Sequence, residues 1–290
     1  MISIDIIIVN YNSTDHLLRC LRSVFDDLNG AAAKIFVQDN ASEDNVDRLN
    51  EIFPTVRLCN NGHNIGFSKA VNKALKISTA EYVLVLNPDT YLFGGFFEPV
   101  VGYMDRHPDV GILGPRILNS DGSLQGSARS HPSALTAFFG RSSVLSKWFP
   151  SNRVTRSNLL TSRSDGVNPM EADWVSGACM LVRREAVKDV GLMDERFFMY
   201  WEDADWCRRM RAKGWKVVYF PRISIVHYVG ASSEKFLFRP ILEFHKSSYR
   251  LFDKYNKPSL WFLKPLVIAG LSIRIPFVLA VNRIRVWSGR

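Results

Sequence analysis

Three features are scarce or missing in this 290-residue sequence. The four cysteines form no C-x-x-C pair, which disfavours a disulfide frame or a zinc site and indicates free thiols in a reducing compartment. There is no G-x-G-x-x-G motif and no glycine-rich loop ending in G-K-S/T, which disfavours a dinucleotide oxidoreductase and a P-loop NTPase. A strand-length apolar run opens the chain without a basic leader or a small-residue cleavage site, so we expect no signal peptide.

Acidic residues are nearly absent from the last part of the chain. The formal net charge is +9, and the stretch from His245 to Arg290 carries nine Lys or Arg and one Asp, so the rest of the chain is close to neutral. This basic stretch is also apolar between Leu260 and Val281. Nucleic-acid binding is disfavoured, because the charge lies on an apolar tail and not on a sheet or a recognition helix.

This mostly apolar segment of 22 residues is long enough to span a bilayer, but Lys264 and Arg274 make insertion costly. We therefore expect one or two amphipathic helices that lie in the membrane interface, with their basic side toward anionic headgroups. The alternative is that the tail packs on the domain or against a second subunit, as in a homodimer.

Strand-like and helix-like segments alternate in the first 90 residues. Ile4–Val9 is an apolar β-branched run typical of a strand buried on both faces, and Ser13 can cap the helix that follows. The alternation continues with strands at 34–40, 56–59 and 81–90 and helices at 43–53 and 66–77. This order predicts an α/β fold with a doubly wound, mostly parallel sheet and a Rossmann-like nucleotide-binding half.

Beyond Gly94 the pattern is looser. We expect a hairpin at 117–125 around Asp121 and Gly122, and a mobile, lid-like loop at 151–169. A strand at 178–183, a helix that ends before Gly214 and a strand ending at His227 complete the prediction.

Two acids follow buried strands. Asp39 is either a local helix cap or an acceptor for a nucleotide base or ribose. Asp89, in Asn-Pro-Asp, is either a turn residue or a ligand for Mg²⁺ or Mn²⁺ together with substrate phosphates. Ligands of doubly wound sheets bind beyond the carboxyl ends of the strands, which favours the functional interpretation of both. The glycines of "NNGHNIGF" precede a helix whose first N–H groups could face a phosphate.

The most distinctive signal is an acid cluster between two tryptophans. Glu202, Asp203 and Asp205 lie between Trp201 and Trp206. Acids at a helix start are favoured by the helix dipole, which is the structural interpretation. Acids beside large aromatics can also be desolvated, which raises the carboxyl pKa and suits a general base next to a sugar. His227, after its strand, is either an ordinary buried histidine or a metal ligand.

These motifs together resemble the inverting glycosyltransferase family 2, which has a GT-A fold. The resemblance covers about Ile4 to Tyr255, and its six segments occur in family order: "IIIVNYN" (6–12), "DNAS" (39–42), "NIGFSKAVNKAL" (64–75), "LNPDT" (86–90), "DWVSGACMLVRREA" (173–186) and "FFMYWEDADWCRRMRAKGW" (197–215). It implies a GT-A domain at 1–256, with a nucleotide-sugar half at 1–115 and an acceptor and catalytic half at 116–256, followed by a membrane-associating tail at 257–290.

The resemblance also implies residue roles. Asp203 is the expected base, with Glu202 as the competing choice, and Asp89 and His227 are the expected ligands of Mg²⁺ or Mn²⁺. Nucleotide contacts are expected from Val9, Asn10, Tyr11, Asn12, Asp39, Asn64, Gly66, Phe67 and Asn87. Acceptor or sugar contacts are expected from Trp174, Gly177, Ala178, Trp201 and Trp206.

Asn87 departs from the family pattern, because the fuller metal motif has an acid at that position. The Asn-Pro-Asp sequence is similar to that of rhamnosyltransferase-like members, which favours dTDP-L-rhamnose as donor; UDP-galactofuranose and other UDP-sugars stay open. The implied acceptor is a glycan or a polyprenyl-diphosphate-linked sugar, at the cytoplasmic face of a bacterial cell membrane, in cell-surface polysaccharide synthesis. A catalytically silent sugar-nucleotide-binding relative is the alternative.

Overall fold

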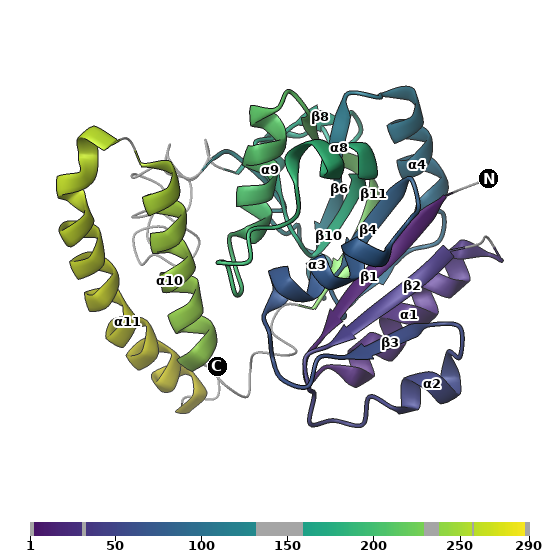
Figure 1. Cartoon of the computed structure of the whole chain (residues 1–290), viewed down its shortest axis with the longest axis horizontal. Helices are drawn as coiled ribbons and strands as arrows, with labels where there is room; N and C mark the ends of the chain where they lie inside the picture. The colour runs from purple at the N-terminus through teal and green to yellow at the C-terminus, as the bar shows by residue number, and fades with distance from the viewer. Residues whose placement is uncertain (1–2, 31–32, 132–158, 229–237, 257, 288–290) are drawn as a thin grey trace.

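The computed structural model describes residues 3–30, 33–131, 159–228, 238–256 and 258–287. A nine-stranded sheet has the order β3-β2-β1-β4-β10-β6-β11-β5, with β8 paired to β11, and β7 and β9 form a small separate sheet (Figure 1). The strands are β1 Ile4–Asn10, β2 Ala33–Asp39, β3 Arg57–Asn60, β4 Tyr82–Leu86, β5 Thr90–Leu92, β6 Val110–Leu118, β7 Ala128–Arg129, β8 Met170–Glu171, β9 Trp174–Val175, β10 Cys179–Arg183 and β11 Lys216–His227.

The pairing confirms the predicted α/β architecture. β1 pairs in parallel with β2 and β4, β2 with β3, and β6 with β11. β10 runs antiparallel to both of its neighbours, β4 and β6, so the sheet is mixed. Because β1, β2 and β4 are parallel, the residues that follow them lie at one edge of the sheet.

Helices cover both faces of the sheet. They are α1 Thr14–Leu28, α2 Arg48–Ile52, α3 Phe67–Ile77, α4 Phe97–Arg106, α8 Arg184–Val190 and α9 Glu202–Ala212, with a 3-10 turn, η1, at Leu160–Arg163. Alternate residues of β1 serve the two faces: Ile6 and Ile8 join the core under α1 and α4, and Ile7 joins the core under α3, α8 and α9. This alternation explains why residues 6–9 of the strand form an unbroken apolar run.

Several local expectations needed correction. The helix expected at 43–53 is only α2, and the strand expected at 81–90 stops at Leu86. A turn interrupts it, in which the Thr90 hydroxyl donates to the Asn87 carbonyl at 2.6 Å, and β5 then pairs with β11. Ser13 stands at the N-cap of α1 but its side chain makes no cap bond. Residues 151–158 of the expected lid lie outside the described part of the chain.

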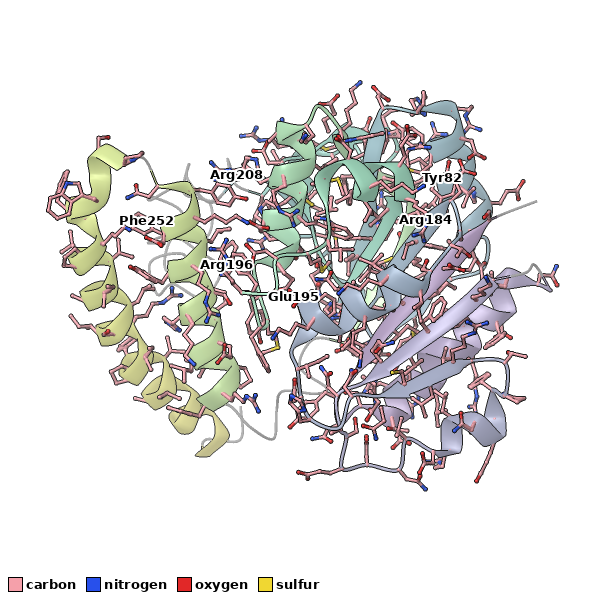
Figure 2. All side chains as sticks on the ribbon, in the orientation of Figure 1. Tyr82, Arg184, Glu195, Arg196, Arg208 and Phe252 are labelled. Atoms are coloured by element: carbon pink, nitrogen blue, oxygen red, sulfur yellow. The ribbon has the colours of Figure 1, made fainter. Side chains whose placement is uncertain are left out.

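The chain ends in a pair of helices beside the sheet domain. α10 (Phe238–Tyr255) packs against the domain, a 3-10 turn, η2 (Pro258–Leu263), follows, and α11 (Lys264–Trp287) runs back along the far side of α10 (Figure 1). In Figure 2, Arg196 and Arg208 lie between the domain and α10, and Phe252 lies between α10 and α11. α10 therefore connects the outer helix to the domain.

The two cations of the apolar tail contact side chains of α10, and the expectation that the basic side of the tail faces headgroups stays a prediction. Lys264 pairs with Asp253 of α10 at 2.5 Å, and the Arg274 guanidinium lies 5.9 Å from the centre of the Phe244 ring. Between Trp261 and Ala280 no other charged residue occurs. The exposed side chains are apolar instead, among them Trp261, Phe262, Leu266, Ile268, Ile273 and Phe277. By length and composition, Trp261–Ala280 could also cross a membrane.

Candidate active site

The edge of the sheet where β1 and β2 end is closed by a polar network. Asp39 is fully buried and accepts hydrogen bonds from Asn10 (2.9 Å), from the Ser42 hydroxyl (2.6 Å) and from the Ser42 backbone N–H (3.0 Å). Asn12, in the left-handed region with φ of 52°, donates its N–H to the Ser42 hydroxyl. Asp39 thus makes local bonds but caps no helix, because α2 begins only at Arg48, and it fixes the loop that starts at Tyr11. The side chain of Val9 packs in the core.

The loop before α3 is also held by internal bonds. Asn64 accepts the Gly66 N–H, and the Phe67 N–H donates to the Phe198 carbonyl at 2.7 Å. These two N–H groups are therefore engaged by protein acceptors, and the expectation that they face a phosphate was wrong for them. Gly66 has φ of +87°, and a Cβ atom there would lie 2.7 Å from the Phe198 carbonyl oxygen. This close approach requires glycine.

The turn after β4 brings three predicted residues together. The His227 Nε2 atom lies 3.3 Å from Asp89 Oδ1 and 3.3 Å from Asn87 Nδ2. β11 carries His227 back beside β5, where it pairs with Thr90, and the Tyr228 N–H donates to the Asp89 carbonyl. Asp89 is 5% exposed. The two expected metal ligands, which are far apart in the sequence, therefore lie side by side.

Asp89 and His227 are a suitable pair for a divalent cation. A carboxylate oxygen and an imidazole nitrogen are ligand types that Mn²⁺ accepts, and Mg²⁺ is typically held by one or two carboxylates plus substrate phosphates. Within the described residues no group of three or more His, Cys, Asp or Glu could hold a metal. Asp89 and His227 leave further coordination positions, which the oxygens of a bound diphosphate would fill.

The acid cluster begins α9 after a strained turn. Tyr200 and Trp201 both have left-handed backbone angles, with φ of 70° and 69°, a conformation that costs non-glycine residues energy and often marks functional sites. Asp203 Oδ2 accepts the Gly177 N–H at 2.9 Å, and the Ala178 carbonyl accepts the Asn87 N–H at 2.9 Å. The 177–178 turn thus lies between the base candidate and the Asn87–Asp89 turn.

The surroundings of the two base candidates differ, although burial raises the pKa of both. For Asp203, hydrogen bonds from the Gly177 and Ala204 N–H groups and the charge of Arg129 oppose that rise. Burial raises the pKa of Glu202 well above its ordinary value, and the neighbouring Asp203 charge raises it further. Glu202 Oε2 is buried and has no hydrogen-bond partner. Asp203 is therefore the first of the two to ionise, and Glu202 keeps its proton longer.

An aromatic wall borders Asp203. The rings of Trp174 and Trp201 are 6.1 Å apart, and Trp201 lies 5.7 Å from Phe244 of α10. Trp206 does not belong to this wall: it is fully buried, and its indole N–H donates to the Gly191 carbonyl at 3.0 Å. The expected contact between Trp206 and a sugar was wrong, because this residue faces the core under α9.

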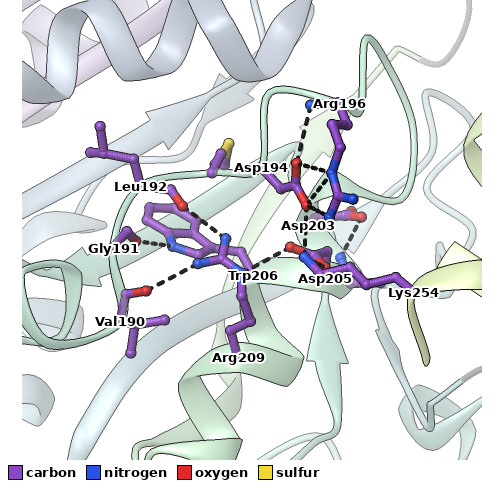
Figure 3. A network of polar contacts seen from close by, with 12 residues as sticks. Val190, Gly191, Leu192, Asp194, Arg196, Asp203, Asp205, Trp206, Arg209 and Lys254 are labelled. Carbon is purple, nitrogen blue, oxygen red and sulfur yellow. Dashed lines mark hydrogen bonds and ion pairs between the residues drawn. The ribbon is translucent and has the colours of Figure 1, made fainter. Parts of the chain in front are cut away.

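Sequence reasoning missed the part that α10 plays at this site. The Ser247 hydroxyl donates to the Met199 carbonyl, and the Trp201 indole donates to Ser248, both at 2.9 Å. Lys254 reaches Asp205 and Asp194 (Figure 3). α10 therefore holds the segment that carries Asp203 at several points. The predicted membrane-associating tail begins at residue 257, so the prediction gave α10 no role at this site.

Comparisons with known proteins agree with this geometry. Residues 5–191 match the sequence model described as glycosyl transferase family 2. The chain is 32% identical to the N-acetylglucosaminyl-diphospho-decaprenol L-rhamnosyltransferase of Mycobacterium tuberculosis over 91% of this chain and 87% of that protein. It is 23% identical to the dTDP-rhamnosyl transferase RfbF of Shigella flexneri, over 96% of this chain and 89% of that one.

The fold also resembles a solved structure. GalNAc-T7 with UDP, GalNAc and Mn²⁺ superposes with a TM-score of 0.58 at 15% identity. The match covers 79% of this chain and 44% of that longer chain, so it concerns fewer than half of the residues of GalNAc-T7. At this identity the likeness concerns the fold alone, and it confirms the expected GT-A fold.

Proposed function

The chain belongs to glycosyltransferase family 2, and on that premise we propose that it is an inverting rhamnosyltransferase. It transfers L-rhamnose from dTDP-L-rhamnose to a hydroxyl group of a glycan or a polyprenyl-diphosphate-linked sugar. The observation that carries the proposal is the 177–178 turn, which is hydrogen-bonded to Asp203 on one side and to Asn87 on the other. Rhamnosyl transfer is favoured because both relatives described above are named for it.

On the donor side, the residues at the ends of β1, β2 and β4 form the nucleotide site. Asn10, Asp39 and Ser42 hold the loop that begins at Tyr11 in shape. Asp89 and His227 would hold a Mg²⁺ or Mn²⁺ ion that neutralises charge developing on the departing nucleoside diphosphate. The presence of Asn at position 87 removes one negative charge beside the diphosphate.

On the acceptor side, Asp203 is the general base. Its burial raises its pKa, and the Gly177 N–H bond fixes its orientation. Asp203 takes the proton of the acceptor hydroxyl while that oxygen attacks the anomeric carbon. The bond between the anomeric carbon and the diphosphate oxygen breaks on the opposite face, which inverts the configuration. Trp174 and Trp201 provide apolar surfaces for a sugar ring.

The outer helix α11 fits an acceptor linked to a lipid. Its outward side chains are apolar, and its two cations up to Ala280 turn toward α10. Such a surface is stabilised by contact with acyl chains. We propose that the protein acts at the cytoplasmic face of the membrane with α11 in contact with lipid, and that the Mycobacterium relative's lipid-diphosphate acceptor indicates the acceptor class.

The test is release of nucleoside diphosphate from a panel of dTDP- and UDP-sugars with Mg²⁺ or Mn²⁺, with lipid-linked acceptor supplied. The native chain is compared with Asp89→Ala, Asp203→Asn and the exposed control Asp165→Asn. We expect metal-dependent release from dTDP-L-rhamnose, lost with Asp89→Ala and Asp203→Asn and kept in the control. Release from a UDP-sugar only would replace the donor, and release from none would favour a catalytically silent binding protein.

A further inference from the structure

We propose that Gln125 is a positioning residue that holds the Nδ1–H tautomer of His227 and so leaves the Nε2 lone pair of that ring for a cation shared with Asp89. Gln125 follows the hairpin between β6 and β7 and is 4% exposed. Its Oε1 atom lies 3.0 Å from His227 Nδ1, and its Nε2 group donates to Asn119 Oδ1 at 2.9 Å. The inference deepens the proposed function, because it concerns a residue behind the proposed metal ligand.

Gln125 belongs to a series of hydrogen bonds that runs from Asp121 to His227. The bond at Asp121 determines the direction of the others. Asp121 Oδ1 lies 2.5 Å from the Ser123 hydroxyl and accepts the Ser123 N–H at 2.9 Å. These two bonds lower the pKa of Asp121, so its carboxylate is ionised at neutral pH and can only accept. The single hydroxyl proton of Ser123 must therefore point to Asp121.

The remaining links are then determined one by one. The Ser123 oxygen has given its proton to Asp121 and accepts from Asn119 Nδ2 at 2.9 Å. This bond leaves Asn119 Oδ1 as the acceptor for Gln125 Nε2. Gln125 consequently presents its Oε1 atom to the ring, and the hydrogen bond at 3.0 Å requires a proton on His227 Nδ1. Reversing any link would leave two acceptors facing each other.

A neutral imidazole with its proton on Nδ1 has a lone pair on Nε2. That atom is the one that lies 3.3 Å from Asp89 Oδ1 and 3.3 Å from the Asn87 amide nitrogen. Asn87 can donate to the lone pair, and a cation between Nε2 and Asp89 Oδ1 would satisfy both of these acceptors, whereas the other tautomer would put a proton where the cation must bind. Histidines that bind metals generally give their second N–H to a fixed acceptor, and loss of such a partner typically weakens metal binding by about 10–100-fold.

The test reads the ring directly. Metal-free protein labelled with ¹⁵N-histidine is examined by NMR at about pH 8.5, above the ordinary imidazole pKa of about 6.5, and His227→Gln assigns the signals. We expect His227 to show the Nδ1–H tautomer in the native chain. We expect Gln125→Met to lose this preference and to bind Mn²⁺ about 10–100-fold more weakly in the presence of dTDP. Leu124→Met, an exposed neighbour in the same hairpin, is the control.

An Nε2–H tautomer in the native chain would overturn the proposal, and this result does not depend on whether any variant folds. Unchanged tautomer and Mn²⁺ affinity in a folded Gln125→Met would also overturn it. A native chain with the Nδ1–H tautomer that bound no Mn²⁺ would support the hydrogen-bond chain and count against the metal role in the proposed function. The two failures are therefore distinguishable.

Discussion

Lys254 of α10 places its ammonium group 2.6 Å from Oδ1 of Asp205, a fully buried carboxylate in the first turn of α9. The same ammonium lies 2.7 Å from Asp194. Asp205 is two residues beyond the proposed base, and it also accepts from Arg209 at 2.9 Å and from the Tyr255 hydroxyl at 2.7 Å. A charged contact thus joins α10, which leads into α11, to α9, which carries Asp203 (Figure 3).

Replacing this lysine is expected to destabilise the fold. Lys254→Met removes one of three partners of a buried charge, and a hydrogen bond to a charged group contributes about 1.5–3 kcal/mol. We expect a loss of that size in the free energy of unfolding, measured with urea. The control is Lys213→Met, which breaks an exposed pair with Asp189 and should cost about 0–1 kcal/mol. Equal losses in the two variants would contradict a special role for Lys254.

Gly66→Ala tests the contact between the loop before α3 and the segment before α9. The new Cβ atom would collide with the backbone oxygen of Phe198, which also accepts the Phe67 N–H. Backbone strain alone costs about 1–3 kcal/mol, and the collision should add to it. Gly62→Ala is the matched control, since Gly62 also has positive φ (+73°) but no neighbour within 4 Å of the added atom. Thermal unfolding should rank Gly66→Ala as the less stable variant.

The central parallel strands were predictable from the sequence, because burial of apolar side chains dominates there. Residues 6–9 of β1 and all of β4 form runs without a charged residue because both faces are covered, and their order along the chain indicated parallel pairing. The antiparallel insertion of β10 between β4 and β6 depends on how distant segments meet, which periodicity does not report. Trp206 was misjudged for a related reason: its position close to the acids in the sequence did not show that its side chain packs in the core under α9.

The sequence predicted the residue types of the candidate site, but not the residues that hold them in place. Asp89 and His227 stand after strands, which indicated a common edge of the sheet. Gln125 contacts His227 from a hairpin, and Lys254 contacts Asp205 and Asp194 from a helix that carried no motif, in each case at 3.0 Å or less. Contacts of this kind depend on tertiary packing, so no local pattern in the sequence predicts them.

The pH dependence of turnover should report Asp203. A base works in its ionised form, so kcat/KM should fall as the pH drops through the Asp203 pKa, which burial raises above the ordinary carboxyl range. The positive charge of Arg129 opposes that rise, so Arg129→Met should move the acid limb to higher pH. Arg129→Lys keeps the charge and should leave the limb nearly in place. A limb that moved to lower pH in Arg129→Met would contradict the assignment of Asp203 as base.

Contact with lipid should depend on the outward side chains of α11. Leu266 and Ile273 are 70% and 73% exposed, and burying one such side chain is worth about 1.5–3 kcal/mol. The double variant Leu266→Ser and Ile273→Ser should therefore lower partition into vesicles by at least about a hundredfold, measured by co-sedimentation. The control double variant Ile52→Ser and Ile77→Ser changes exposed apolar residues of α2 and α3 and should bind as the native chain does.

The same variants distinguish a lipid surface from a second subunit as the partner of α11. If α11 contacts a bilayer, the native chain binds vesicles at protein concentrations where light scattering finds a monomer, and the serine variant loses only vesicle binding. If α11 forms a subunit interface, the native chain is a dimer without lipid and the serine variant is a monomer. Vesicle binding that survived the substitutions would also contradict lipid contact, because Lys264 and Arg274 face α10 and offer little attraction to headgroups.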